Sequence, residues 1–149
     1  MKLTTFTDYS LRVLIYLATE PERLATIAEI ARTFNVSESH LMKVVHFLAQ
    51  HGWLATVRGK GGGLGLGMQP ADIVIGEVVR ATEGPAVPAE SFGSDPENCV
   101  IAGACRLKAV LNEAANAFYA VLDKYTLADL MRNRAMLNQI LRIVPARAV

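Results

Sequence analysis

Two cysteines that lie close together, Cys99 and Cys105, are the residues of this chain best suited to chemistry. They sit in a polar segment at the start of a predicted helix, with Arg106 and Lys108 beside them. Helix amide groups and nearby cations stabilise a thiolate, which is the form that binds metals. The C-x5-C pair is half of a tetrahedral metal site, but it lacks the spacing of zinc ribbons. The spacing alone favours two unconnected buried cysteines, so only their position favours metal or redox chemistry.

A second candidate pair is Asp8 and Arg12, one helical turn apart near the start of the chain. Asp8 falls in the first turn of a predicted helix, where the helix dipole favours a carboxylate. A carboxylate and a guanidinium at this spacing can form an ion pair on one helix face. The residues by themselves favour an ordinary surface ion pair.

A glycine-rich loop carrying Arg58 and Lys60 lies between two short apolar stretches, Trp53–Val57 and Leu64–Leu66. Glycines such as Gly59 allow a loop tip to approach another surface closely, and the two cations attract phosphate. We therefore expect a β-hairpin whose tip contacts DNA. The same run also fits a solvated turn. A nucleotide-binding loop is disfavoured, because neither glycine fingerprint for such loops is in register.

The stretch before this hairpin predicts a helix-turn-helix. Apolar residues recur at helical spacing over Ile27–Phe34 and again from Glu38 to about Gln50. Between them lies a short turn in which Ser37 is suited to cap the second helix. The inner face of the second helix is apolar and comprises Leu41, Val44, Val45 and Leu48. Its outer face is polar and mildly basic, which suits the DNA major groove; it comprises Ser37, Ser39, His40, Lys43 and His46.

Further helices must position these residues. The first is predicted over Phe6–Ala18, with Thr5 or Thr7 as its cap and a buried stripe of Leu11, Leu14, Ile15 and Ala18. Another is predicted over about Ile75–Thr82, packed on the preceding domain and ended by Gly84 and Pro85.

The longest helix is predicted from about Ala104 to Tyr125 and has a wide apolar face. A domain of about 80 residues is too small to bury that face, so we expect a two-fold symmetric dimer. Thr126 and Asp129 predict a capping box for a last short helix. The tail from Arg132 is mixed in character, and we expect it to fray.

Composition bounds the class of protein. The chain has 149 residues, 52% of them hydrophobic, and a formal net charge of +1, so DNA binding depends on local clusters of cations. No apolar run is long enough for a membrane span, which needs about 18 residues, and no signal peptide is visible. We expect a cytoplasmic protein without a membrane partner. An enzyme is disfavoured, because His40, His46 and His51 have no identifiable nucleophile nearby.

Two segments, LTTFTDYSLRVLIYLA and SESHLMKVVHFLAQHGWLATVRGKGGGLGL, resemble the opening helix, recognition helix and wing of the Rrf family of winged-helix repressors. The resemblance covers nearly the whole chain. The segment CVIAGACRLKAVLNEAANAFYAVLDKYTLADL is most similar to nitric-oxide-sensing iron–sulfur members. The resemblance implies a mainly α fold with a small β-hairpin wing. Residues 1–83 would form the winged helix-turn-helix domain, 84–106 the cysteine-containing cluster loop, and 104–149 the dimerisation helix and tail.

The resemblance also implies a function. The chain would be a homodimeric repressor that binds double-stranded operator DNA and releases it when nitric oxide attacks an iron–sulfur cluster, [4Fe–4S] or [2Fe–2S]. Cys99 and Cys105 would be cluster ligands, and Asp8 of the partner subunit, with Arg12 beside it, would complete the site. The cluster loop would set the separation of the two recognition helices.

One position departs from the family pattern. The family has a third cysteine, commonly followed by phenylalanine, eight residues before Cys99, where this chain has Ser91. A serine hydroxyl is far harder to deprotonate than a thiol and is a poor ligand for soft metals. Two thiolates and Asp8 leave a four-iron cluster one ligand short. We therefore expect a labile, altered or absent cluster.

Other functions fit the same residues. Cys99 and Cys105 can act as a thiol–disulfide switch without metal, or the chain can be a general iron–sulfur or iron-status regulator of the same family. A winged-helix protein-interaction module is a further alternative, and it would lack salt-dependent affinity for duplex DNA.

We predict that the chain with Ser91 holds substoichiometric iron and sulfide after anaerobic reconstitution, whereas Ser91→Cys holds a stable cluster. The third thiolate supplies the missing ligand. Iron and sulfide assays on both chains, together with visible absorbance, measure the difference. A stable, stoichiometric cluster with serine in place would defeat the prediction.

Overall fold

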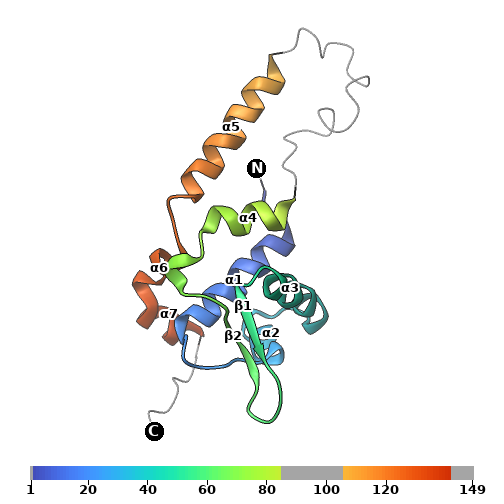
Figure 1. Cartoon of the computed structure of the whole chain (residues 1–149), viewed down its shortest axis with the longest axis vertical. Coiled ribbons are helices and arrows are strands. Elements are labelled where there is room, and N and C mark those ends of the chain that lie inside the picture. Colours follow the sequence, from blue (N-terminus) through green and yellow to red (C-terminus); the bar gives the residue numbers. More distant parts are fainter. Residues whose placement is uncertain (1, 85–105, 142–149) are drawn as a thin grey trace.

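A computed structural model describes residues 2–84 and 106–141 (Figure 1). Its elements in chain order are α1 (Thr5–Thr19), α2 (Ile27–Phe34), α3 (Glu38–Gln50), β1 (Leu54–Val57), β2 (Gly63–Leu66), the 3-10 turn η1 (Pro70–Asp72), α4 (Ile75–Glu83), α5 (Leu107–Leu122), α6 (Leu127–Leu130), the 3-10 turn η4 (Met131–Asn133) and α7 (Arg134–Leu141). A mainly helical chain with a two-stranded antiparallel hairpin confirms the predicted fold class. Within the described ranges, no helix is both long and apolar enough to cross a membrane.

Helix α1 lies at the centre of the molecule and contacts α3, α4, α6, α7 and β2. Large side chains that are fully removed from solvent come from α1 itself and from five other segments of the same core: Leu14, Ile30, Leu41, Leu48, Ile73, Val78 and Leu127. Each such side chain contributes about 1.5–3 kcal/mol relative to an exposed position. The core is therefore shared between the helix-turn-helix and the C-terminal helices.

The start of α1 differs from the prediction. Its cap is Thr4, whose side-chain oxygen accepts a hydrogen bond from the Thr7 amide at 3.2 Å, so neither Thr5 nor Thr7 has that role. Thr7 is instead fully buried, and its hydroxyl donates to Glu83 at the end of α4. The capping residue was misjudged because this long-range partner determines where the Thr7 side chain points.

The buried surface of α1 is also wider than the predicted stripe. Leu14 and Ala18 are buried as expected, but Leu11 and Ile15 are only half-buried. Val13 and Leu17 are buried instead. A single apolar stripe describes a helix that is covered on one side, whereas α1 is covered from several directions.

The two helices of the predicted helix-turn-helix form, and the second has the predicted cap, Ser37. Thr26 caps α2 and Ser37 caps α3, each accepting a hydrogen bond from a main-chain amide in the first turn. Asn35 ends α2 with a left-handed backbone at φ +53°, a conformation that asparagine tolerates better than most residues. This turn reverses the chain direction enough for α3 to pack against α2.

The hairpin pairs Leu54 with Leu66 and Val57 with Gly63, close to the predicted strands. It is attached to the helix-turn-helix through Ala25, whose amide and carbonyl exchange hydrogen bonds with Leu64 at 3.0 and 2.7 Å. A side chain at Gly63 would collide with the Ala25 carbonyl, so glycine permits this close approach. The wing is therefore tied to the segment that leads into α2.

Two predictions for the C-terminal part need correction, the end of α5 and the tail that follows Arg132. Helix α5 ends at Leu122, three residues before the predicted end, and its predicted start at Ala104 lies outside the described residues. The capping box of Thr126 and Asp129 is present, as predicted.

The expected fraying from Arg132 onward is wrong for α7. Arg134 Nε donates to the Thr19 carbonyl, and Asn138 Nδ2 donates to Glu20. These contacts stabilise α7 against the C-terminal end of α1.

We predict that Leu127→Ala lowers the free energy of unfolding by about 2–5 kcal/mol, because it leaves a cavity at a fully buried site. Leu130→Ala in the same short helix is the matched control. Its side chain is 39% exposed, so a change of about 0.5 kcal/mol is expected. Urea unfolding of both variants measures the difference, and a loss of about 0.5 kcal/mol or less for Leu127→Ala would show that α6 is not part of the core.

Candidate nucleic-acid interface

The outer face of α3 is open to solvent as predicted. Its inner residues Leu41, Val44, Val45 and Leu48 are all buried, and its outer residues Ser37, Ser39, His40, Lys43 and His46 are all exposed. Helical periodicity therefore oriented this helix correctly. Ser37 has a second role that limits its freedom, because its hydroxyl caps α3 and lies 3.3 Å from the Ser39 hydroxyl.

Sequence reasoning missed one residue of this surface. Met42 is 54% exposed and lies between Ser39 and His46 on the outward side of α3. It was passed over because the search was for polar side chains. An exposed apolar group in the first two turns of such a helix offers a surface for the methyl group of thymine, the apolar feature of the major groove.

Aromatic packing supports the other end of α3. Phe47 meets Phe6 of α1 edge to face at a centroid distance of 5.2 Å. His51 lies between Phe47 and Trp53, at 4.2 and 4.9 Å, and its Nδ1 is 2.9 Å from the Phe47 carbonyl oxygen. These contacts join α1, the end of α3 and the beginning of β1. They therefore constrain the position of the wing relative to α3.

The tip of the wing presents Arg58, Gly59 and Lys60, all exposed. Gly59 has φ +98°, a conformation that disfavours any side chain. The Gly62 amide donates to the Gly59 carbonyl at 2.9 Å and closes the loop. The two cations are thus carried on a tight turn beyond the end of the sheet (Figure 1).

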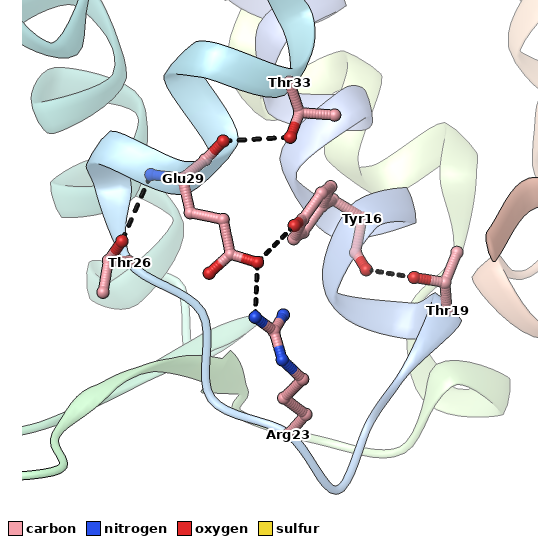
Figure 2. A network of polar contacts seen from close by, with 6 residues as sticks. All are labelled: Tyr16, Thr19, Arg23, Thr26, Glu29 and Thr33. Atoms are coloured by element: carbon pink, nitrogen blue, oxygen red, sulfur yellow. Dashed lines mark hydrogen bonds and ion pairs between the residues drawn. The ribbon is translucent and has the colours of Figure 1, made fainter. Parts of the chain in front are cut away.

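A polar network holds α2 against α1 (Figure 2). The Tyr16 hydroxyl donates to Glu29 Oε1 at 2.6 Å, and Arg23 pairs with the same oxygen at 2.5 Å. Figure 2 also shows the Glu29 amide donating to the side chain of Thr26. Glu29 therefore links the cap of α2 to both Tyr16 and Arg23. The network constrains the orientation of α2 relative to α1.

The acid–base properties of this network follow from its partial burial. Burial by itself would raise the pKa of the Glu29 carboxyl, but the hydrogen bonds from Tyr16 and Arg23 outweigh it, and the pKa is lowered. Burial and the hydrogen bond to Glu29 raise the pKa of Tyr16. Glu29 is therefore a carboxylate, and Tyr16 a neutral donor, near neutral pH.

Asp8 and Arg12 form the predicted ion pair, with Arg12 Nη2 2.8 Å from Asp8 Oδ2 and Arg12 Nε 3.0 Å from Asp8 Oδ1. Both side chains are almost half exposed. Arg12 also lies over the Phe34 ring, 5.8 Å from its centroid. The other predicted ligands, Cys99 and Cys105, lie outside the described residues, as does Ser91, the position of the missing cysteine.

Comparison with known proteins identifies the family. The model of the Rrf2 family, described as iron-dependent transcriptional regulators, matches residues 3–133. The chain belongs to the Rrf2 family. It is 54% identical to the HTH-type transcriptional regulator NsrR of Bacillus subtilis (strain 168), over 96% of this chain and 99% of that protein.

Two solved structures of the family share its fold. The T. potens IscR structure has a TM-score of 0.72 and 28% identity, covering 89% of this chain and 88% of that chain. CymR, the global cysteine regulator of B. subtilis, has a TM-score of 0.67 and 32% identity, covering 87% and 95%. These likenesses confirm the predicted winged-helix fold and the predicted family, and a regulator's role agrees with the expectation that the chain is not an enzyme.

We predict that Glu29→Gln lowers the free energy of unfolding at pH 7 by about 1–3 kcal/mol, because it removes a charged hydrogen-bond acceptor. The lowered pKa means that this stabilisation is present above the unfolded-state pKa of glutamate, about 4.3. It is lost as the pH falls from there through the folded-state pKa.

Urea unfolding of both proteins between pH 7 and pH 3 checks this expectation. Glu22→Gln, at an exposed position of the neighbouring turn, is the control and should change little. A difference between wild type and Glu29→Gln that stays constant down to pH 3 would refute the assignment.

Proposed function

We propose that this chain is a homodimeric repressor that binds operator DNA through α3 and the wing, and whose affinity is controlled by an iron–sulfur cluster that reacts with nitric oxide. The observation that carries the DNA-binding part is the outer face of α3, exposed and mostly polar, beside a cationic wing tip. A protein-interaction module has no need for cations on such a glycine turn. Membership of a family of transcriptional regulators supports the same reading.

The residues at this surface divide by chemistry. Lys43, Arg58 and Lys60 attract phosphates and supply affinity that is independent of sequence. Ser39 and His40 can donate or accept hydrogen bonds at base edges. Met42 offers an apolar contact to thymine. Gly59 allows the wing tip to enter the minor groove, because it has no side chain to obstruct it.

Dimerisation through α5 is supported by the surface of that helix. Throughout α5, Tyr119 alone is buried. Leu107, Val110 and Val121 are each more than half exposed, and Ala114 and Ala117 are exposed between them. An apolar helix face of this kind is suited to packing against a second copy of itself around a two-fold axis. Two copies of α3 would then be available for two half-sites.

The cluster would be held by Cys99, Cys105 and Asp8 of the partner subunit, with Arg12 orienting the carboxylate. Asp8 fits this role, because its carboxylate is exposed on the first turn of α1 and its negative charge is already balanced by Arg12. A bound iron–sulfur cluster supplies iron that reacts with nitric oxide. The donor set remains one thiolate short at Ser91, and the cluster is therefore weakly held.

The same shortage supports a second candidate function. With serine at position 91, the soft ligands that remain are two thiols six positions apart, which suit a disulfide as well as a metal. In that case oxidation of Cys99 and Cys105, not nitric oxide, controls DNA binding. Absorbance of anaerobically purified protein in the visible range distinguishes the two.

We predict that Lys43→Ala weakens binding to all duplex DNA and makes the salt dependence shallower by about one phosphate contact. Lys124→Ala is the matched control, since Lys124 is also exposed but lies between α5 and α6. Fluorescence anisotropy with a selected operator and a scrambled duplex, over a range of salt concentrations, measures both quantities. An unchanged affinity and salt slope for Lys43→Ala would show that α3 does not contact DNA.

A further inference from the structure

Helix α5 is attached to the rest of the molecule near one end. Figure 1 shows its N-terminal turns extending away from the body, while its C-terminal turns lie against α4. Its one buried residue, Tyr119, is in the last of those turns, with Phe118 and Leu122 half-buried beside it. The direction of the whole helix therefore depends on a few contacts around its C-terminus.

The main chain fixes the position of that end. The Ile75 amide donates to the Tyr125 carbonyl at 2.9 Å, and the Leu127 amide donates to the Ile73 carbonyl at 2.8 Å. These bonds hold the turn after α5 beside the turn before α4. These bonds do not determine the angle between α5 and α4. They hold only the turn that follows α5, and the helix can still tilt about that turn.

The angle is constrained by a pair of side chains. Arg80 of α4 donates to both carboxylate oxygens of Asp123, at 2.7 and 2.5 Å, in a fork-to-fork arrangement. The guanidinium also lies over the Tyr119 ring, 4.7 Å from its centroid. The hydrogen bond from Arg80 lowers the pKa of Asp123, which is consistent with a carboxylate held in place. Two parallel hydrogen bonds and a stacked ring restrict the orientation of α5 relative to α4, whereas a single hydrogen bond would not.

Gly76 makes room for this arrangement. A Cβ atom at this position in α4 would overlap the Asp123 carboxylate and press on the Asp123 amide. Glycine is unfavourable inside a helix compared with alanine. The approach of Asp123 to α4 gives a physical reason for glycine at this buried position.

We propose that the Arg80–Asp123 pair, placed between Tyr119 and Gly76, sets the tilt of α5 on the DNA-binding domain and thereby the separation of half-sites that the dimer reads. This inference rests on the proposed function. Helix α5 has 16 residues and is about 24 Å long, so a tilt of about 10° displaces its far end by about 4 Å. A base pair advances about 3.4 Å along DNA, so such a tilt matters for spacing.

Arg80 and Asp123 are positioning residues in this proposal and do not contact DNA. The pair is partly exposed, with side chains 44% and 39% accessible, and such pairs contribute little to stability. Its loss should therefore leave the fold intact and change the geometry. That combination separates a positioning role from a merely structural one.

The test uses the full chain and an operator selected from random duplexes, with the half-site separation increased or decreased by one base pair. Wild type should prefer the selected spacing by about tenfold or more, and Arg80→Gln should reduce this preference to about twofold. Gly76→Ala, which displaces the carboxylate without altering charge, should have the same effect. Arg80→Asp combined with Asp123→Arg should restore the preference in part.

Arg132→Gln is the matched control, because it breaks another exposed ion pair, with Asp129, that involves neither α4 nor α5. Sedimentation and circular dichroism establish that every variant remains folded and in the oligomeric state of wild type. Undiminished spacing preference in both Arg80→Gln and Gly76→Ala overturns the inference, while salt-dependent operator binding by those variants leaves the proposed function standing. If wild type binds no duplex at low salt, the proposed function is overturned and this inference with it.

Discussion

The burial of α1 is the constraint on which the rest of the structure depends. Eight of its 15 residues are buried, and three of these, Thr7, Ser10 and Thr19, are polar. Their hydroxyl groups donate to Glu83, to the Phe6 carbonyl and to the Tyr16 carbonyl respectively. Buried polar groups are tolerated when they are hydrogen-bonded, so α1 can be enclosed on several sides without an energetic penalty at these positions.

Enclosure of α1 makes a rigid base from which the functional surfaces project. The helix-turn-helix is joined to it through Tyr16 and Glu29, and α4 is joined to it through Thr7 and Glu83. The wing tip lies at one end of the molecule, beside α3, and α5 extends from the opposite end (Figure 1). In the proposed dimer, a change in the direction of α5 would therefore alter the separation of the two α3 helices without unfolding the chain.

Asp8 illustrates how one residue can satisfy a structural and a chemical requirement together. In the described part of the chain it is an exposed member of an ion pair with Arg12, as local spacing suggests. Its place at the N-terminal turn of α1 also stabilises the helix through the dipole. In the proposed function the same carboxylate meets the cysteine segment of a partner subunit. Helix stability and ligand availability thus favour the same residue at the same position.

Much of the site could be read from local patterns. The orientation of α3 followed from the spacing of Leu41, Val44, Val45 and Leu48, and the wing from a glycine-rich turn between two apolar stretches. The caps Ser37 and Thr126 were equally readable. Met42 was not, because an exposed apolar residue has no local signature that separates it from the core.

The amino-acid sequence by itself determined most of the helices, the caps at Ser37 and Thr126, the hairpin and the apolar face of α3, because those features depend on residues within one or two turns of each other. Only the tertiary structure decided the cap at Thr4, the docking of α7 on Thr19 and Glu20, and the pairing of Arg80 with Asp123. Partners separated by 43 or 115 positions are brought together by packing of the whole chain. No local sequence pattern specifies which distant side chain will contact a given residue.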